Sequence, residues 1–374
     1  MGLSDESGAP RRPALLEVVR MFGWLGVIGV GGPAAHIALM RRRVVERDRW
    51  VSEDDFARLV GACALVPGPN STEMAMALGA RRAGWRGLVA GGAAFIVPAF
   101  AIVCVVAFLY EDVLTSAVIT EARRWIVPIV AAIVLDALWS VRRTAMCDRR
   151  DALVVIAAPV AAVLGVPELL VLLVVGVASL VLRMTAAGAR LGAFGAPAAV
   201  PLVVAQLVAP SLTKIFLVFL QIGSVIYGSG YVLLVFLDSE VVARGWITRD
   251  VLLDAISVGQ FTPGPVFTTA TFIGWHLAGF AGAALATLGI FGPSFVFAAF
   301  VDRVVQWSHR SAAFAAFLRG VSSGSIALMA VVVWRLAGEA FVNETSIDRV
   351  AVAVFVVAFA AIRGRAWRHA RSAR

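Results

Sequence analysis

The stretch Pro67-Gly68-Pro69-Asn70-Ser71-Thr72-Glu73 interrupts an apolar segment, and its Pro-Gly-Pro recurs as Pro263-Gly264-Pro265, again within apolar sequence. Proline and glycine break helices. In lipid, a broken helix is tolerated only where protein or a water-filled cavity surrounds it. A matched pair of interrupted apolar segments, one in each half of a membrane protein, best marks a transporter's binding site. We therefore expect the two breaks to form the functional centre of the chain.

The composition is that of a membrane protein. Of the 374 residues, 60% are hydrophobic and 15% are charged, and the mean hydropathy is +0.88. Apolar runs such as Leu88–Tyr110 and Leu217–Leu237 reach the ~20 residues that a helix needs to cross a bilayer. We predict an all-α polytopic protein embedded in the lipid bilayer. Residues 1–13 are polar and lack an obvious cleavage site, which favours a retained first span over a signal peptide.

Charge and motifs exclude several classes of function. The net charge is +9 and Lys214 is the one lysine, a balance that fits arginine-rich cytoplasmic loops. No basic domain or recognition motif accompanies the charge, so we expect no nucleic-acid partner. The three cysteines have no paired spacing, so neither a disulfide framework nor a metal site is expected. Walker A, dinucleotide-binding, HExxH and CxxC motifs are absent from the sequence, so we predict a protein that is not an enzyme and has no cofactor.

The chain reads as a duplication at an offset of 195–196 residues, which aligns Trp50 with Trp246 and Pro98 with Pro293 as well as the two Pro-Gly-Pro stretches. Self-similarity of this kind is the signature of a repeated structural unit. We predict a first transmembrane repeat over residues 1–190, a linker over 191–209 and a second transmembrane repeat over 210–374.

Charge asymmetry predicts that the two repeats have opposite orientations in the membrane. The loop Arg41–Arg58 carries six arginines, whereas its counterpart Asp238–Asp250 carries two. Equivalent loops with opposite charge bias lie on opposite sides of a membrane, which makes this an inverted-topology repeat. Leu59–Ala80 has arginines at both ends, so a re-entrant or broken-helix hairpin is expected there, and Val251–His276 should enter from the other side. The arginine-rich tail predicts a cytoplasmic C-terminus.

The residues after each Pro-Gly-Pro are suited to an anion. Asn, Ser and Thr favour helix N-caps, and a helix N-terminus presents unpaired N–H groups and the positive end of a dipole. Two such termini near the membrane midplane would hold an anion between neutral donors. The alternative is a pair of tight turns with satisfied caps and no ligand. The predicted binding residues are Gly68, Asn70, Ser71, Thr72, Gln260, Thr262, Gly264, Thr268, Thr269 and Arg319.

Ionisable residues within apolar sequence have open roles. Glu73 suits either a helix cap or a proton carrier. His36 would titrate or bind an anion, or be satisfied by a neighbouring helix. Arg319 would bind an anion through two N–H groups of its guanidinium, or extend to the membrane–water interface, whereas Arg124 fits the interface role. Asp136 requires an arginine partner or a proton, and the sequence does not identify one.

Five strings resemble the chromate ion transporter (CHR) family in its long, two-domain form. They are GGPAAH (31–36), PGPNSTEM (67–74), RAGWRG (82–87), GSGYVLL (228–234) and VGQFTPGPVFTTATF (258–272). The resemblance covers most of the chain. It implies efflux of chromate across the plasma membrane, chromate resistance, and homologous halves of opposite orientation.

Three alternatives stay open. Sulfate or another oxyanion would meet the same donors as chromate, and a passive anion channel would use the same breaks. A membrane-embedded phosphatase is the third. The chain is similar to undecaprenyl-pyrophosphate phosphatases in its inverted repeats and re-entrant segments, but it lacks their closely spaced glutamates. The sequence also leaves homo-oligomer formation open.

Overall fold

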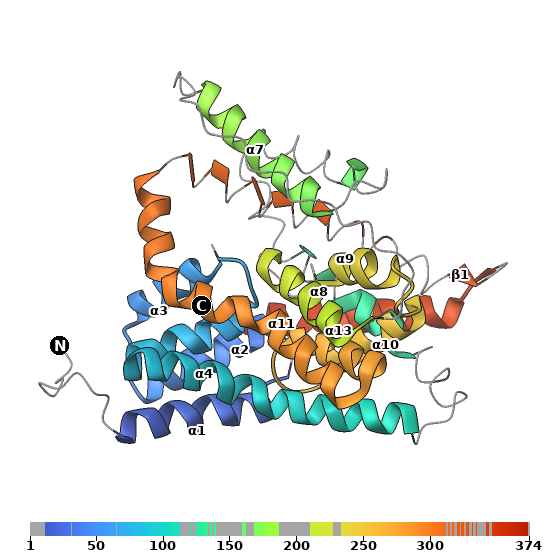
Figure 1. Ribbon diagram of the computed structural model, residues 1–374, viewed down its shortest axis with the longest axis horizontal. Helices are drawn as coiled ribbons and strands as arrows, with labels where there is room; N and C mark the ends of the chain where they lie inside the picture. Colours follow the sequence, from blue (N-terminus) through green and yellow to red (C-terminus); the bar gives the residue numbers. More distant parts are fainter. Residues whose placement is uncertain are drawn as a thin grey trace, which may run out of the picture. The chain divides into compact units, whose positions relative to one another are not determined.

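A computed structural model (Figure 1) describes residues 12–30, 32–64, 66–112, 168–186, 210–226, 233–311 and 346–372, with short stretches between 121 and 161 and between 313 and 343. Four features of the sequence prediction fall outside the described residues: Arg124, Arg319, the linker 191–209 and the glycines near 228–230.

The chain forms two compact units. The first comprises the described residues of Met1–Glu121, Pro210–Leu233 and Asp250–Gln306, and the second those of Ala122–Ala209, Leu234–Arg249 and Trp307–Arg374. Each unit draws on both predicted repeats, so spatial grouping does not follow the repeat boundaries, which stay a prediction. Both Pro-Gly-Pro breaks belong to the first unit.

The described elements are helical apart from one two-residue pairing, which agrees with the predicted all-α class. The helices of the first unit are α1 (Arg12–Ile28), α2 (Gly32–Arg41), η1 (Arg42–Arg47), α3 (Glu53–Cys63), α4 (Asn70–Asp112), α8 (Leu212–Val225), α10 (Arg249–Phe261), η3 (Val266–Thr268) and most of α11 (Thr269–Arg310). The remaining elements are α7 (Glu168–Ala186), α9 (Leu233–Leu237), η2 (Asp238–Val242), β1 (Val342–Asn343), β2 (Ser346–Ile347) and α13 (Arg349–Ser372). Strands β1 and β2 pair antiparallel.

Helix α4 reverses direction after its first few turns. Ala83 (φ −141°, ψ 26°) and Gly84 (φ 61°, ψ −153°) leave the helical region. A methyl group on Gly91 would lie 2.6 Å from the carbonyl oxygen of Ala75, and Gly79 and Gly87 touch through their backbones. In a straight helix, residues eight apart are separated by ~12 Å. Residues Asn70–Arg82 therefore form a short helix packed antiparallel against the long one that begins at Trp85.

Helix α11 repeats this reversal. Ala278 (φ −157°, ψ 36°) and Gly279 (φ 57°, ψ −149°) are non-helical, and Gly274 and Gly282 come into backbone contact. Glycine adopts positive φ without the steric cost that a Cβ brings. Each repeat therefore contains a Pro-Gly-Pro break, a short helix, a glycine turn and a long helix, in that order.

Helix α1 packs along α4 (Figure 1), and α8 packs on α11 in the corresponding way. A Cβ on Gly26 would lie 2.7 Å from the carbonyl oxygen of Phe95, and one on Gly223 would lie 2.9 Å from Cα of Ile290. Small residues let helix backbones approach closely inside a membrane. Among the described residues, the stretches Asn70–Tyr110 and Val266–Val301 contain segments apolar enough to cross a bilayer. Because each stretch reverses at its glycine turn, the long helix after the turn is the part that could cross in one pass.

Replacing Gly79 with alanine should open the α4 hairpin, because the new methyl group would overlap the carbonyl oxygen of Gly87. Overpacking of this kind costs about 1–3 kcal/mol. The thermal midpoint of the detergent-solubilised protein should fall and aggregation should increase in size-exclusion chromatography. The matched control is Gly61→Ala in α3, where a methyl group meets nothing within 4 Å. Equal midpoints for the two variants would contradict the tight hairpin.

Candidate functional site

The first break separates α3 from the short helix at the start of α4. Helix α3 ends at Cys63, and α4 begins at Asn70. Between them Gly68 has φ 137°, a conformation that side chains other than glycine rarely adopt. The N–H groups of Thr72 and Glu73 both donate to the carbonyl of Pro69, at 2.8 and 3.1 Å. The break thus holds a helix C-terminus and a helix N-terminus side by side in sequence.

The second break has the same construction. Helix α10 ends at Phe261, the 3₁₀ turn η3 follows, and α11 begins at Thr269. Gly264 has φ 98°. The N–H of Thr268 donates to the carbonyl of Pro265 at 3.0 Å, as Thr72 does to Pro69 in the first break.

Each break is tied to the other repeat by an equivalent hydrogen bond. The Gly68 N–H donates to the carbonyl of Ile226 at the end of α8, at 2.8 Å, and the Gly264 N–H donates to the carbonyl of Gly29 just after α1, also at 2.8 Å. A buried backbone N–H must find a partner. Here each break finds it at the end of the first helix of the opposite repeat, so the two repeats interlock.

Buried side-chain oxygens without a hydrogen-bond partner in the described part of the chain concentrate at the first break. They belong to Asn70, Thr72, Glu73 and Ser294, and both carboxylate oxygens of Glu73 are included. Gly68 brings two of them together: a Cβ there would overlap Oε1 of Glu73 and lie 2.7 Å from Oγ of Ser294. Buried polar groups are nearly always paired. This cluster is therefore the clearest sign of a ligand in the described residues.

The hydroxyls at the second break are already engaged. Thr268 and Thr269 donate to the carbonyls of Pro265 and Val266 at 2.9 Å, and Thr262 donates to that of Val258 at 2.6 Å. These bonds use the hydroxyl hydrogens, and the backbone N–H groups of Thr268 and Thr269 also have carbonyl partners, Pro265 for the first and Val266 and Phe267 for the second. Gln260 is buried beside them in sequence, at 7% exposure. The predicted role of these residues as donors to a ligand stays a prediction.

His36 joins α2 to the second break. Its Nε2–H donates to the carbonyl of Gly29 at 2.9 Å, the oxygen that also accepts from Gly264. The ring packs edge-on against Phe95, with the ring centroids 5.3 Å apart. His36 is buried, and its Nδ1 has no partner among the described residues. The sequence predicted that a neighbouring helix could satisfy His36. Nε2 has such a partner in Gly29, and Nδ1 has none among the described residues.

The sequence of this chain matches a known protein family. The family model described as "Chromate transporter" matches this chain twice, over residues 16–181 and 213–368. The chain belongs to the chromate transporter family. The resemblance read from the five sequence strings is thereby confirmed.

Three relatives from the chromate transporter family match most of the chain. The chromate transport protein of Pseudomonas aeruginosa is 30% identical, over 81% of this chain and 76% of its own length. A probable chromate transport protein of Synechococcus elongatus is 28% identical, over 86% of this chain and 85% of its own. The chromate transport protein of Cupriavidus metallidurans is 28% identical, over 88% and 84%. No solved structure matches the chain significantly.

Two contacts in this member of the chromate transporter family were not predicted from the sequence. Ser294 joins the first break from α11; it follows Pro293 as Ala99 follows Pro98, so the repeat alignment contained a signal for it. Asp136, for which no partner was identified, accepts a hydrogen bond from Arg363 at 3.2 Å within the second unit. Nothing in the spacing of these two residues predicts that pairing.

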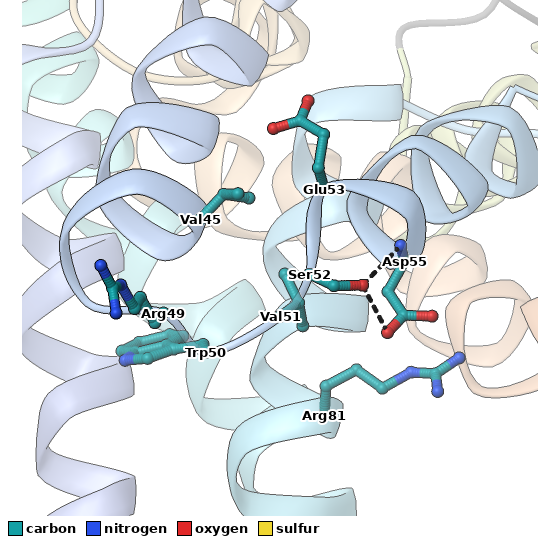
Figure 2. A pocket seen from close by; sticks show the side chains of 8 residues that line it. All are labelled: Val45, Arg49, Trp50, Val51, Ser52, Glu53, Asp55 and Arg81. Atoms are coloured by element: carbon teal, nitrogen blue, oxygen red, sulfur yellow. Dashed lines mark hydrogen bonds between the residues drawn. The ribbon is translucent and has the colours of Figure 1, made fainter.

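A separate hollow of about 550 Å³ lies at the start of α3 (Figure 2). Its lining residues are Val45, Arg49, Trp50, Val51, Ser52, Glu53, Asp55 and Arg81. Ser52 caps α3 by accepting from the Asp55 N–H at 3.1 Å and donating to Oδ2 of Asp55 at 2.9 Å. Glu53 accepts two bonds from the Arg41 guanidinium, at 2.7 and 2.9 Å. A helix cap and an ion pair explain these polar groups, so we assign no ligand to the hollow.

This ion pair should make stability pH-dependent. The Arg41 hydrogen bond and charge lower the pKa of the exposed Glu53 carboxyl. Because the folded-state pKa lies below the unfolded one, the pair stabilises above the unfolded pKa and its contribution is lost as pH falls through the folded pKa. The thermal midpoint of Glu53→Gln should be slightly below wild type at pH 7, and the two should converge on acidification. Asp54→Asn, in the same exposed first turn, controls for the helix dipole. If the midpoint of Asp54→Asn converges with wild type on acidification and that of Glu53→Gln does not, the ion pair is refuted.

Proposed function

We propose that this chain is a secondary transporter that exports chromate across the plasma membrane and thereby confers chromate resistance. Membership of the chromate transporter family and three relatives named for chromate transport support the substrate. The observation that carries the proposal is the pair of reciprocal hydrogen bonds by which each Pro-Gly-Pro break docks on the other repeat. Matched breaks within a duplicated membrane protein are where transporters place their substrate.

The anion is proposed to bind at the N-termini of the two short helices. The first N–H groups of a helix have no partner within it, and the dipole adds partial positive charge there. Gly68, Asn70, Ser71 and Thr72 border one terminus. Gln260, Thr262, Gly264, Thr268 and Thr269 border the other. Chromate is a tetrahedral dianion, and neutral donors hold it without the trapping that several fixed positive charges would cause.

The two repeats, 1–190 and 210–374, are proposed to lie in opposite orientations with the C-terminus in the cytoplasm. The matching breaks, glycine turns and helix contacts of the first unit support a shared repeat. Each short helix would then return to the side from which its break entered. Moving a dianion out of a negative interior releases about 4–5 kcal/mol at ~100 mV. The membrane potential alone therefore favours export.

The test is chromate uptake into inverted membrane vesicles, whose outer face is the cytoplasmic one. Vesicles that contain the protein should take up chromate in a saturable way, faster when the interior is positive. Vesicles without the protein supply the baseline. Uptake equal to that baseline would refute the proposal, and uptake that does not saturate would favour a channel. Unlabelled sulfate in excess tests the choice of anion: suppression of chromate uptake would show that sulfate binds the same site.

The same vesicles test the site. Asn70→Ala removes an amide at the first break and should reduce uptake at low chromate about tenfold or more, because bonds to charged groups contribute ~1.5–3 kcal/mol. Ser257→Ala is the matched control, since that buried hydroxyl donates to the carbonyl of Leu253 within its own helix. Equal loss in both variants would indicate general damage to the fold and would remove Asn70 from the site.

A further inference from the structure

We infer that Glu73 and Ser294 form a binding site for a sodium ion at the first Pro-Gly-Pro break. The two side chains come from opposite repeats, Glu73 from the first turn of α4 and Ser294 from the middle of α11. Both lie against Gly68, where a Cβ would overlap Oε1 of Glu73 and approach Oγ of Ser294 to 2.7 Å. The missing side chain at position 68 is what allows the two oxygens to face the same point.

The oxygens of this pair are buried and unsatisfied. Glu73 and Ser294 are both 0% exposed, and neither carboxylate oxygen nor the serine hydroxyl has a hydrogen-bond partner in the described part of the chain. No basic side chain among the described residues lies within ion-pair distance of Glu73. An ionised carboxylate in such surroundings is very costly unless a cation accompanies it.

The donor set fits a monovalent metal ion better than a bound proton. A protonated Glu73 would carry an O–H that makes no hydrogen bond to the described residues as they are placed, which is an unfavourable arrangement for a buried donor. Oxygens are the ligands of hard cations. A single carboxylate supplies one negative charge, so Na⁺ leaves the site neutral, whereas a divalent ion would leave a buried net charge.

The break offers further oxygens for the same ion. The amide oxygen of Asn70 is buried and unpartnered, and Asn70 shares a helix face with Glu73, three residues later. Helix α3 ends at Cys63, so its last carbonyls point toward the break. In broken-helix transporters, unwound carbonyls and half-helix C-termini coordinate coupling cations. The second break has Thr269 where the first has Glu73, so this chemistry is confined to one break.

Bound sodium would then raise the affinity of the site for the anion. This consequence rests on the proposed function. An uncompensated carboxylate repels a dianion at the adjoining helix N-terminus, and a bound Na⁺ removes that repulsion. Each ligand therefore raises the affinity for the other by the same factor. The cation then lies beside the anion at the first break, and the second break, which has no acid, adds its helix start to the anion site.

The binding test uses the full chain in detergent and Na⁺ as the probe. A ligand that binds the folded state raises the thermal midpoint. Sodium chloride should raise the midpoint of the wild type above that in choline chloride of equal ionic strength. The increment should vanish in Glu73→Gln, and Ser294→Ala should need roughly 10- to 100-fold more Na⁺ for the same increment. Ser257→Ala, whose hydroxyl is satisfied within α10, should behave as wild type.

Three results would overturn the sodium site. They are equal midpoints in sodium and choline, an increment that persists in Glu73→Gln, and a midpoint that responds to pH alone. If Glu73→Gln does not fold, the Ser294→Ala titration decides. Vesicle uptake separates the two proposals: chromate uptake that ignores Na⁺ refutes the coupling and leaves transport standing, whereas Na⁺ stabilisation without chromate uptake refutes the transport function and leaves the site.

Discussion

Replacing Gly68 with alanine should abolish chromate uptake while leaving a membrane-inserted chain. The backbone at this position has φ 137°, where a side chain is strained by about 1–3 kcal/mol. The new methyl group would also overlap Oε1 of Glu73 and crowd Oγ of Ser294 at 2.7 Å. Either the break moves or the two oxygens separate, and both outcomes disrupt the first half of the site. Uptake into inverted vesicles and the thermal midpoint measure the effect.

Two comparisons sharpen this expectation. Gly61→Ala, in α3 and seven residues before Gly68, places a methyl group in open space and should keep wild-type uptake. In Gly68→Ala/Ser294→Ala the serine oxygen is gone, so part of the crowding is relieved and the midpoint should recover in part. Wild-type uptake by Gly68→Ala would show that the first break takes no part in transport.

The breaks were predictable because proline and glycine act locally. Pro67 to Pro69 interrupts the helix whatever surrounds it, and the second copy indicates that the interruption belongs to a repeat. The reversal inside α4 was harder to see. Ala83 and Gly84 lie in sequence that contains three nearby arginines but no proline, and nothing in hydropathy shows that Gly84 adopts φ 61°. The predicted hairpin ended at Ala80, so the sequence did not locate the turn at Ala83 and Gly84.

Partners distant in sequence could not be predicted from spacing. Asp136 pairs with Arg363 across 227 positions, and Ser294 reaches Gly68 from the other repeat. Both pairings depend on how helices pack, which a single sequence does not encode in any local pattern. The threonine hydroxyls show a different limit. Ser and Thr in helices often bond to carbonyls three or four residues earlier, and Thr262 and Thr268 do so.

The second break offers a stronger test, because its contact partner can be altered independently. Gly264→Ala should also abolish uptake: φ is 98°, and the methyl group would overlap the Cβ of Ala99 in α4. Ala99→Gly alone removes that Cβ and costs about 1 kcal/mol as a glycine within a helix. It should keep most of the uptake.

Combining the two changes separates backbone strain from steric overlap. Gly264→Ala/Ala99→Gly relieves the overlap but not the strain, so its uptake and thermal midpoint should lie between those of Gly264→Ala and wild type. Residues in contact give interaction energies of about 0.5–3 kcal/mol in such cycles. If the losses of stability in the two single variants simply add in the double variant, the second break does not contact the long helix of the first repeat at Ala99. A positive coupling energy would instead show that the two repeats are in contact at Gly264, whose N–H donates to the carbonyl of Gly29. A substitution in one repeat then changes the stability of the other.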